Sequence, residues 1–311
     1  MREGYDPAVE GPDSGSWPAH TSWTQVSASP NVWDMTYTAE SLNAYGTLDL
    51  HSCIQSGGGY AEKSHGGKVI FGDLTTVTGL YKMFAGCDGL TEVHDLRTLN
   101  GEAGIAEGMF KNCTRLTDVD LFDTRGVTTM QEMFYGCSSL QAAPAFDMSS
   151  CTDATDMFTF CTSLTSAPLR NTGNVPVWAH AFSQCDALLV TPDLDLAGAT
   201  DVIGMFAECD VLTTMRAYNT ANATDMRQMF DGCIALEEVL LLRTDKARIV
   251  DNMFRNCRAV ESGALALYLQ MSGQTTPPSS HWQTFVYCGA DTASGAAELA
   301  QIPTSWGGTA T

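Results

Sequence analysis

The chain has 311 residues, about twice the size of a typical domain, which leaves two domains or one elongated repeat array open. Its 16 Lys and Arg residues stand against 36 Asp and Glu, and the net charge of −20 argues against binding of nucleic acid or of an anionic lipid surface. A hydrophobic content of 44% argues against a disordered acidic tail. The sequence contains no run of about 18 consecutive apolar residues, the length that a membrane-spanning helix needs. Its first residues lack the basic and apolar regions of a secretion signal.

Residues 1–72 form a predicted N-terminal module whose composition differs from that of the rest of the chain. Three tryptophans, Trp17, Trp23 and Trp33, lie in it among Ser, Pro and Gly, which indicates a buried contact. Two interpretations stay open. The module is either a cap that covers the first repeat or an attachment domain that fastens the chain to a larger assembly.

Residues 73–271 carry the repeat Met-Phe-x-x-Cys-x-x-Leu, with cysteines separated by steps of 26 and then 24 residues, and a phenylalanine stands three residues before each ladder cysteine. A last copy follows after a step of 31 residues. Because small free cysteines are among the most buried residue types, we predict a stacked structural ladder in the core. Its members are Phe84, Cys87, Phe110, Cys113, Phe134, Cys137, Phe158, Cys161, Phe182, Cys185, Phe206, Cys209, Phe230, Cys233, Phe254, Cys257, Phe285 and Cys288.

Each unit is expected to contain one helical turn and one short strand. Met, Phe, Cys and Leu at relative positions 0, 1, 4 and 7 share one face of a helix, and stretches such as 116–124 and 236–244 have the alternation typical of a strand. A unit of this size cannot close a core alone, so neighbouring units must stack. The predicted fold is an α/β leucine-rich-repeat-like solenoid: a right-handed curved array of 24-residue units with a parallel sheet and capped ends.

The segments 116–137 and 140–161 resemble the BspA-like class of bacterial leucine-rich repeats, whose units read L-x-x-L-P-x-F-D-T-S-N-V-T-D-M-x-x-M-F-x-x-C. Members of that family are surface-exposed, non-enzymatic proteins implicated in adhesion. The resemblance therefore implies a binding role at the surface of a cell, although the export signal usual in the family is absent from the printed sequence.

Residues 272–311 are predicted to form a C-terminal repeat and cap. Pro277 and Pro278 predict an irregular loop at 272–280. A short helical pattern follows at 296–302, and Pro303 ends it.

The chemistry-bearing residues give little support to an enzyme or a metal protein. No Cys-x-x-Cys pair and no histidine in phase with the ladder are present, so we expect no metal site and no cofactor. The close pairs His51 with Cys53 and His180 with Cys185 are the only candidates for a nucleophilic Cys/His site. We expect that the chain is not an enzyme.

Alternating carboxylates offer a second candidate ligand set. Asp118, Asp120 and Asp123, and again Asp193 and Asp195, could supply oxygen ligands to calcium. The full calcium-loop pattern is missing, so solvated acidic strand edges are the favoured interpretation.

The best candidate binding site is a row at seven and nine residues after each ladder cysteine, hereafter positions +7 and +9. If +6 and +8 point to the core, the row lines the open face of the sheet. The row contains His94, Leu96, Asp120, Phe122, Phe146, Arg170, Arg216, Tyr218, Leu240 and Leu242. The alternative, in which a bulge turns the apolar +9 position inward as core, stays open.

The sequence thus predicts a non-enzymatic protein-binding or adhesion module that recognises a partner through the sheet face, with a basic surface expected on that partner. The alternative is a structural or receptor-binding component of a virus particle or other large assembly, mounted through residues 1–72.

Overall fold

The computed structural model describes residues 80–87, 90–94, 96 and 104–310, together with the backbone of three earlier strands. These are β1 (Ser22–Ala28), β2 (Asn31–Thr36) and β3 (Gly67–Phe71). They continue into β4 (Leu90–His94) and β5 (Asp118–Val119) as one sheet in the order β1-β2-β3-β4-β5. The pairing is antiparallel between β1 and β2 and parallel between the later strands. The expected roles of residues 1–72 otherwise fall outside the described residues.

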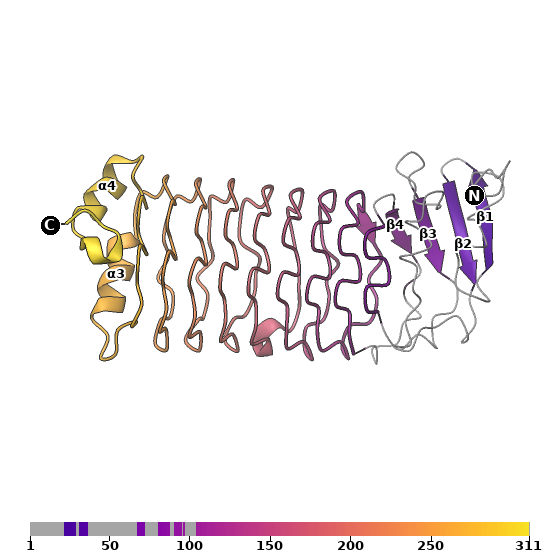
Figure 1. The fold of residues 1–311 in the computed structure, drawn as a ribbon, viewed down its shortest axis with the longest axis horizontal. Coiled ribbons are helices and arrows are strands. Elements are labelled where there is room, and N and C mark those ends of the chain that lie inside the picture. Colours follow the sequence, from indigo (N-terminus) through magenta and orange to yellow (C-terminus); the bar gives the residue numbers. More distant parts are fainter. Residues whose placement is uncertain are drawn as a thin grey trace.

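The described residues after β5 form a solenoid of stacked coils that runs from the sheet at one end to two helices at the other (Figure 1). Parallel bridges join residues 24 apart in successive coils, from Thr129 to Asp153, Val177, Asp201 and Asp225. The predicted repeat solenoid with parallel pairing is therefore present. Regular strand is rarer than predicted, because most coils contribute isolated bridges and only β4 and β5 are strands in the coils from residue 80 onward.

The predicted helical turn in each unit is wrong, since the described residues 104–263 contain no α-helix. In the Met-Phe-x-x-Cys segment, alternate backbone N–H groups bond to the next coil, as from Phe134 to the carbonyl of Met157 at 2.9 Å. The N–H groups between them close local turns, as from Met133 to Met130 at 3.1 Å. Glu132 and Gly136 have φ values of 54° and 72°, which an α-helix does not contain. Hydrogen bonds between coils thus replace those of a helix.

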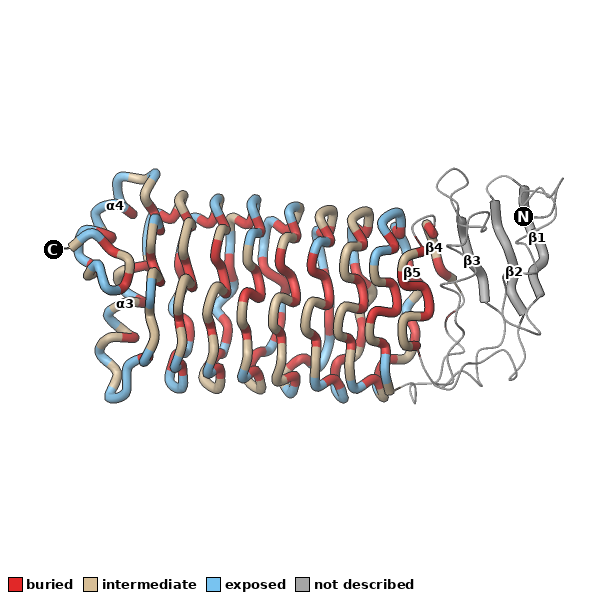
Figure 2. The backbone as a smooth tube through the Cα atoms, viewed as in Figure 1, coloured by how far each residue is buried: buried red, intermediate tan, exposed pale blue. Residues whose placement is uncertain are grey.

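The ladder residues are buried, and buried residues recur in every coil of the array (Figure 2). Neighbouring phenylalanine rings stack with centroids 5.1 to 5.5 Å apart from Phe84 to Phe254, and 6.2 Å apart between Phe254 and Phe285, where the repeat step lengthens. Each ladder thiol from Cys113 to Cys257 donates to the carbonyl of the ladder phenylalanine of the preceding coil, at 3.0 to 3.3 Å. The ladder therefore joins each coil to the one before it.

The C-terminal end contains α3 (Ala264–Ser272), α4 (Ala293–Leu299) and the 3-10 helix η4 (Thr304–Trp306). Helix α3 was not anticipated, because its sequence ALALYLQMS is apolar on most sides and lacks the Met-Phe-x-x-Cys pattern. The helix predicted at 296–302 begins and ends three residues earlier, as α4. One further 3-10 helix, η3 (Thr172–Asn174), interrupts the middle of the array.

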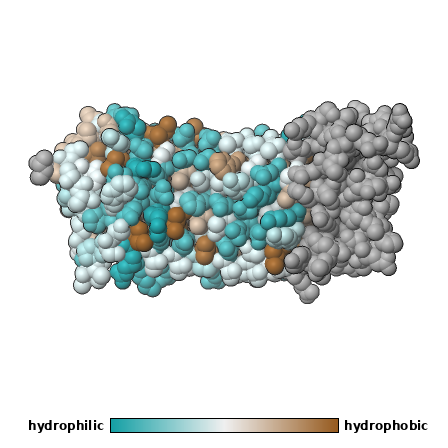
Figure 3. Space-filling view, viewed as in Figure 1, coloured by the Kyte–Doolittle hydropathy of each residue, from teal (hydrophilic) through white to brown (hydrophobic). Residues whose placement is uncertain are grey.

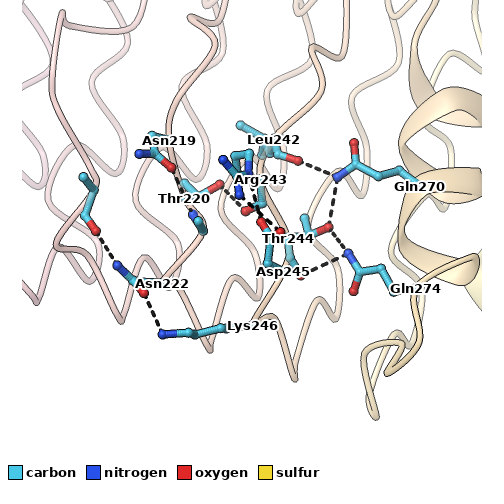
Figure 4. A network of polar contacts seen from close by, with 12 residues as sticks. Asn219, Thr220, Asn222, Leu242, Arg243, Thr244, Asp245, Lys246, Gln270 and Gln274 are labelled. Carbon is cyan, nitrogen blue, oxygen red and sulfur yellow. Dashed lines mark hydrogen bonds and ion pairs between the residues drawn. The ribbon is translucent and has the colours of Figure 1, made fainter.

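Two glutamines extend from α3 and the turn after it toward the last regular coil (Figure 4). In earlier coils the hydroxyl of Thr220 donates to the carbonyl of Arg243 in the next coil, at 2.7 Å. At Thr244 no regular coil follows, and Gln270 and Gln274 donate to its hydroxyl oxygen at 3.1 and 2.7 Å. Side-chain amides thus satisfy the polar groups that a further coil would bond.

Candidate protein-binding surface

The structure corrects half of the predicted +7/+9 row. The +9 residues Leu96, Phe122, Phe146, Tyr218 and Leu242 are buried, as are most residues at +6. In the coils that begin at Cys113, Cys137, Cys209 and Cys233, neither of the two residues between these positions is buried, so the segment does not alternate as a regular strand would. A strand of period two would have placed +6 and +9 on opposite faces. The open alternative, with +9 turned inward, is the arrangement observed.

The remaining members of the row reach the surface. Arg170 and Arg216 are exposed, and Leu240 is half-buried. His94 is half-buried between two carboxylates, with Nδ1 3.0 Å from an oxygen of Asp120 and Nε2 3.0 Å from an oxygen of Glu92. The row is therefore not a continuous displayed stripe.

Two of the leucines at +8, a position predicted to point into the core, lie on the surface instead. Leu121 and Leu241 are 49% and 56% exposed. The sequence contained a signal for this arrangement: +9 is apolar or aromatic in every unit except at Arg170, whereas +8 also holds Asp193. The more uniformly apolar position is the buried one.

Three shallow grooves lie along the segments that follow the ladder cysteines, with volumes of about 510, 280 and 430 Å³. Each is lined by at least one apolar side chain and at least one arginine. We call this set the apolar–arginine stripe. It consists of Leu121, Ala145, Arg125 and Arg170 in the first groove, Pro168, Val190 and Arg216 in the second, and Leu241 and Arg243 in the third. The grooves place apolar surface beside hydrogen-bond donors.

The arginines of the stripe differ in how far they are neutralised. Arg125 binds Asp123 through Nε at 3.0 Å and Nη2 at 2.6 Å, and these bonds lower the pKa of Asp123. Arg243 binds Asp245 in the same way, at 3.0 and 3.3 Å. Arg216 donates from Nε to the backbone carbonyl of Thr191 at 3.0 Å. For Arg170, no side-chain hydrogen bond or ion pair joins it to any described residue.

The catalytic candidates are not assembled into a site. The thiol of Cys185 is buried and donates to the carbonyl of Phe158 at 3.3 Å, and burial raises its pKa well above the ordinary value. His180 is half-buried in a turn with a φ of 56°. His51 and Cys53 fall outside the described residues.

The carboxylates weighed as calcium ligands have other partners or lie apart. Asp120 contacts His94, Asp123 binds Arg125, and Asp195 accepts from the N–H of Ala197 at 2.9 Å. Across the described part of the chain, no three His, Cys, Asp or Glu side chains are grouped as a metal site would require.

The surface seen in Figure 3 is largely hydrophilic, with apolar side chains in separate patches. No helix in the described ranges has the length and apolar character needed to cross a membrane.

The chain is similar to three solved leucine-rich-repeat structures. The leucine-rich-repeat protein TpLRR of T. pallidum is 14% identical with a TM-score of 0.35, and the match covers 85% of this chain and 98% of that protein. A protein from Bacteroides ovatus is 16% identical with a TM-score of 0.24, covering 62% and 63%. A protein from Eubacterium ventriosum is 13% identical with a TM-score of 0.25, covering 75% and 86%.

No curated protein sequence matches the chain. A family described as "Mycoplasma protein of unknown function, DUF285" matches three overlapping segments, residues 69–172, 104–214 and 179–266. Together these segments span more than half of the chain, including the ladder from Phe84 to Cys257 and the apolar–arginine stripe. The chain belongs to the DUF285 family.

Proposed function

We propose that the chain is a non-enzymatic protein-binding module of the adhesion type that recognises its partner through the apolar–arginine stripe. The observation that carries the proposal is the succession of three grooves along the segments that follow the ladder cysteines, each combining apolar surface with an arginine. Apolar contacts give a protein interface its affinity, and arginine is enriched at such interfaces. Because the coils hold the grooves on a rigid frame, the surface needs little ordering when the partner binds.

The charge of the chain supports a partner with a basic surface. The net charge of −20 attracts a positively charged protein over a distance of about a Debye length, about 8 Å at physiological salt. Asp193 is exposed at the edge of the second groove, and Asp147 lines the first. These carboxylates offer pairing sites beside the apolar residues.

The proposal extends to the scaffold. Residues 73–271 act as a right-handed array of 24-residue coils, residues 1–72 as an N-terminal cap or attachment module, and residues 272–311 as the C-terminal cap. The amides of Gln270 and Gln274, which bond the hydroxyl of Thr244 in place of a further coil, support the C-terminal part of this assignment.

The experiment is site-specific photo-cross-linking in the native source. A photoreactive residue replaces Leu121 or Leu241 on the stripe. As a control it replaces Thr200, which is exposed and precedes Asp201 in the series of backbone bridges between coils. We expect the two stripe positions to capture the same protein, the control to miss it, and the Leu121→Asp, Leu241→Asp double variant to lose it. Equal capture from Thr200, or capture that survives the double variant, contradicts the proposal.

The same experiment separates adhesion from a role in a larger assembly. Products isolated from the outer cell surface support adhesion. Products found only within purified particles, at a fixed ratio to the other particle proteins, assign the chain to the assembly instead.

A further inference from the structure

One coil of the stripe is shifted by a residue relative to its neighbours. In the coil that begins at Cys161 the buried residue after Ala167 is Leu169, at +8, and Arg170 takes the outward place that follows. The backbone pairing shows the same shift, because Asp147 is bridged to Arg170, 23 residues later, whereas the other bridges between coils in this region span 24. Asn171, in the left-handed conformation with a φ of 55°, absorbs the extra residue before Thr172 is buried again.

The shift places an arginine beside an aspartate. Arg170 is bridged to Asp147 of the preceding coil, and Asp195 holds the position of Asp147 in the following coil. Neither neutralises Arg170. Asp147 accepts from the N–H of Ser149 at 2.9 Å and from the Asn171 amide at 3.0 Å, and Asp195 accepts from the N–H of Ala197 at 2.9 Å.

Arg170 therefore brings a full set of guanidinium donors, unused by any described residue, to the largest groove of the stripe. Leu121, Phe122 and Ala145 give that groove an apolar lining. The second arginine of the groove, Arg125, is already held by Asp123. A ligand that buried only apolar groups here would leave Arg170 desolvated and without an acceptor, which is costly.

We propose that this groove binds an extended peptide segment of the partner in which an aliphatic side chain stands next to an aspartate or glutamate. The aliphatic side chain packs against Leu121 and Ala145, and the carboxylate accepts hydrogen bonds from the guanidinium of Arg170. This inference rests on the proposed function and names the ligand chemistry of one groove. The acidic chain attracts the basic partner as a whole, and the single carboxylate fixes the register of the segment along the coils.

The test uses the full chain and fluorescein-labelled nine-residue peptides rich in lysine. Two peptides differ only at the centre, where one carries leucine–aspartate and the other leucine–asparagine. A third replaces the leucine of the first by serine. Fluorescence anisotropy at physiological salt gives the dissociation constants. We expect the aspartate peptide to bind about tenfold more tightly than the other two, the change expected for one charged hydrogen-bonded contact or one buried aliphatic side chain.

Arg170→Gln is expected to abolish the preference for aspartate over asparagine. The matched control is Arg248→Gln, because Arg248 is also exposed and makes no side-chain hydrogen bond or ion pair with a described residue, yet lies outside the stripe. Equal affinities for the aspartate and asparagine peptides, or an equal loss of preference in both variants, overturn the inference.

The outcomes also separate the inference from the proposed function. If the peptides bind equally and Leu121→Asp weakens all of them, the stripe binds protein and only the role of Arg170 is wrong. If Leu121→Asp changes none of the affinities, or no peptide binds, both the inference and the proposed function are contradicted.

Discussion

Arg255 and Asp231 form a two-pronged ion pair across adjacent coils, with Nε 2.9 Å and Nη2 2.6 Å from the two carboxylate oxygens. The Asp231 side chain is only 7% exposed, so the pair lies at the boundary between surface and core. We expect Asp231→Ala to lower the free energy of unfolding by about 2 kcal/mol, between the values typical of exposed and of buried pairs. Urea unfolding of the single and double Ala variants measures the coupling. A coupling energy near zero would show that the pair contributes nothing.

The stacked phenylalanines predict a large difference between two neighbours in one turn. Phe158 is fully buried between Phe134 and Phe182, whereas Phe160 is 37% exposed and touches Tyr135 edge-on. Phe158→Ala should cost about 3 to 5 kcal/mol, because it leaves a cavity in the stack. Phe160→Ala should cost about 1 kcal/mol. Equal losses in denaturant unfolding would contradict the assignment of the ladder as the core.

Buried thiols predict that stability falls in alkaline solution. Burial raises the pKa of Cys151 from its ordinary value of 9.0 to about 11, and that of Cys209 to about 12. Such a thiol stays neutral in the folded chain but ionises in the unfolded one above pH 9.0. Its contribution is therefore complete below that pH and is lost at about 1.4 kcal/mol per pH unit up to the folded pKa.

The variant Cys151→Ala isolates one such thiol, because alanine already occupies the equivalent core position at Ala199 and Ala223. We expect it to fold and to make the decline of stability between pH 9 and 11 less steep by the slope of one thiol. Urea unfolding at several pH values gives the two slopes. Parallel curves for the variant and the parent chain would show that Cys151 does not titrate as described.

The start of α3 depends on a glycine. Gly263 has a φ of +98°, and a Cβ added there would lie 1.9 Å from the carbonyl oxygen of Val239. Gly263→Ala should destabilise the C-terminal end by at least about 1 kcal/mol from the backbone conformation alone. The control is Gly104→Ala, where the nearest atom is 3.9 Å away. Hydrogen exchange of the α3 amides measures the effect, and unchanged protection in Gly263→Ala would contradict it.

The parts of the fold that could be predicted from the sequence are those fixed by identical side chains at a constant step. Phe134, Phe158 and Phe182 repeat with one spacing, and stacking equivalent residues is the simplest way to bury all of them. The local backbone was not predictable in the same way. Positions 0, 1, 4 and 7 suit a helix, but they also suit a chain of turns with left-handed residues such as Glu132 and Gly136.

The candidate site was predictable only in part, because the register within a coil decides which side chains are displayed. Two residues between the buried Val119 and Phe122 face outward, and this moves Leu121 to the surface. In the coil that begins at Cys161, only one outward residue separates the buried Ala167 and Leu169, so Arg170 faces outward. In the sequence this slip shows only as Leu169 at +8 followed by Arg170 at +9, and a single exception among the units does not fix the register.

Because the ring spacing of the phenylalanine ladder is nearly the same from Phe84 to Phe254, the length of the array is set by the number of its coils. Each interior coil contacts its two neighbours through the same ring stack and thiol bonds, and the C-terminal end has its own contacts through Gln270 and Gln274. Duplication or loss of one coil by unequal recombination would change the length by a single ring spacing, 5.1 to 5.5 Å, without new chemistry at either end. A chain with one coil more or fewer would therefore place its last groove one ring spacing farther from, or nearer to, its first.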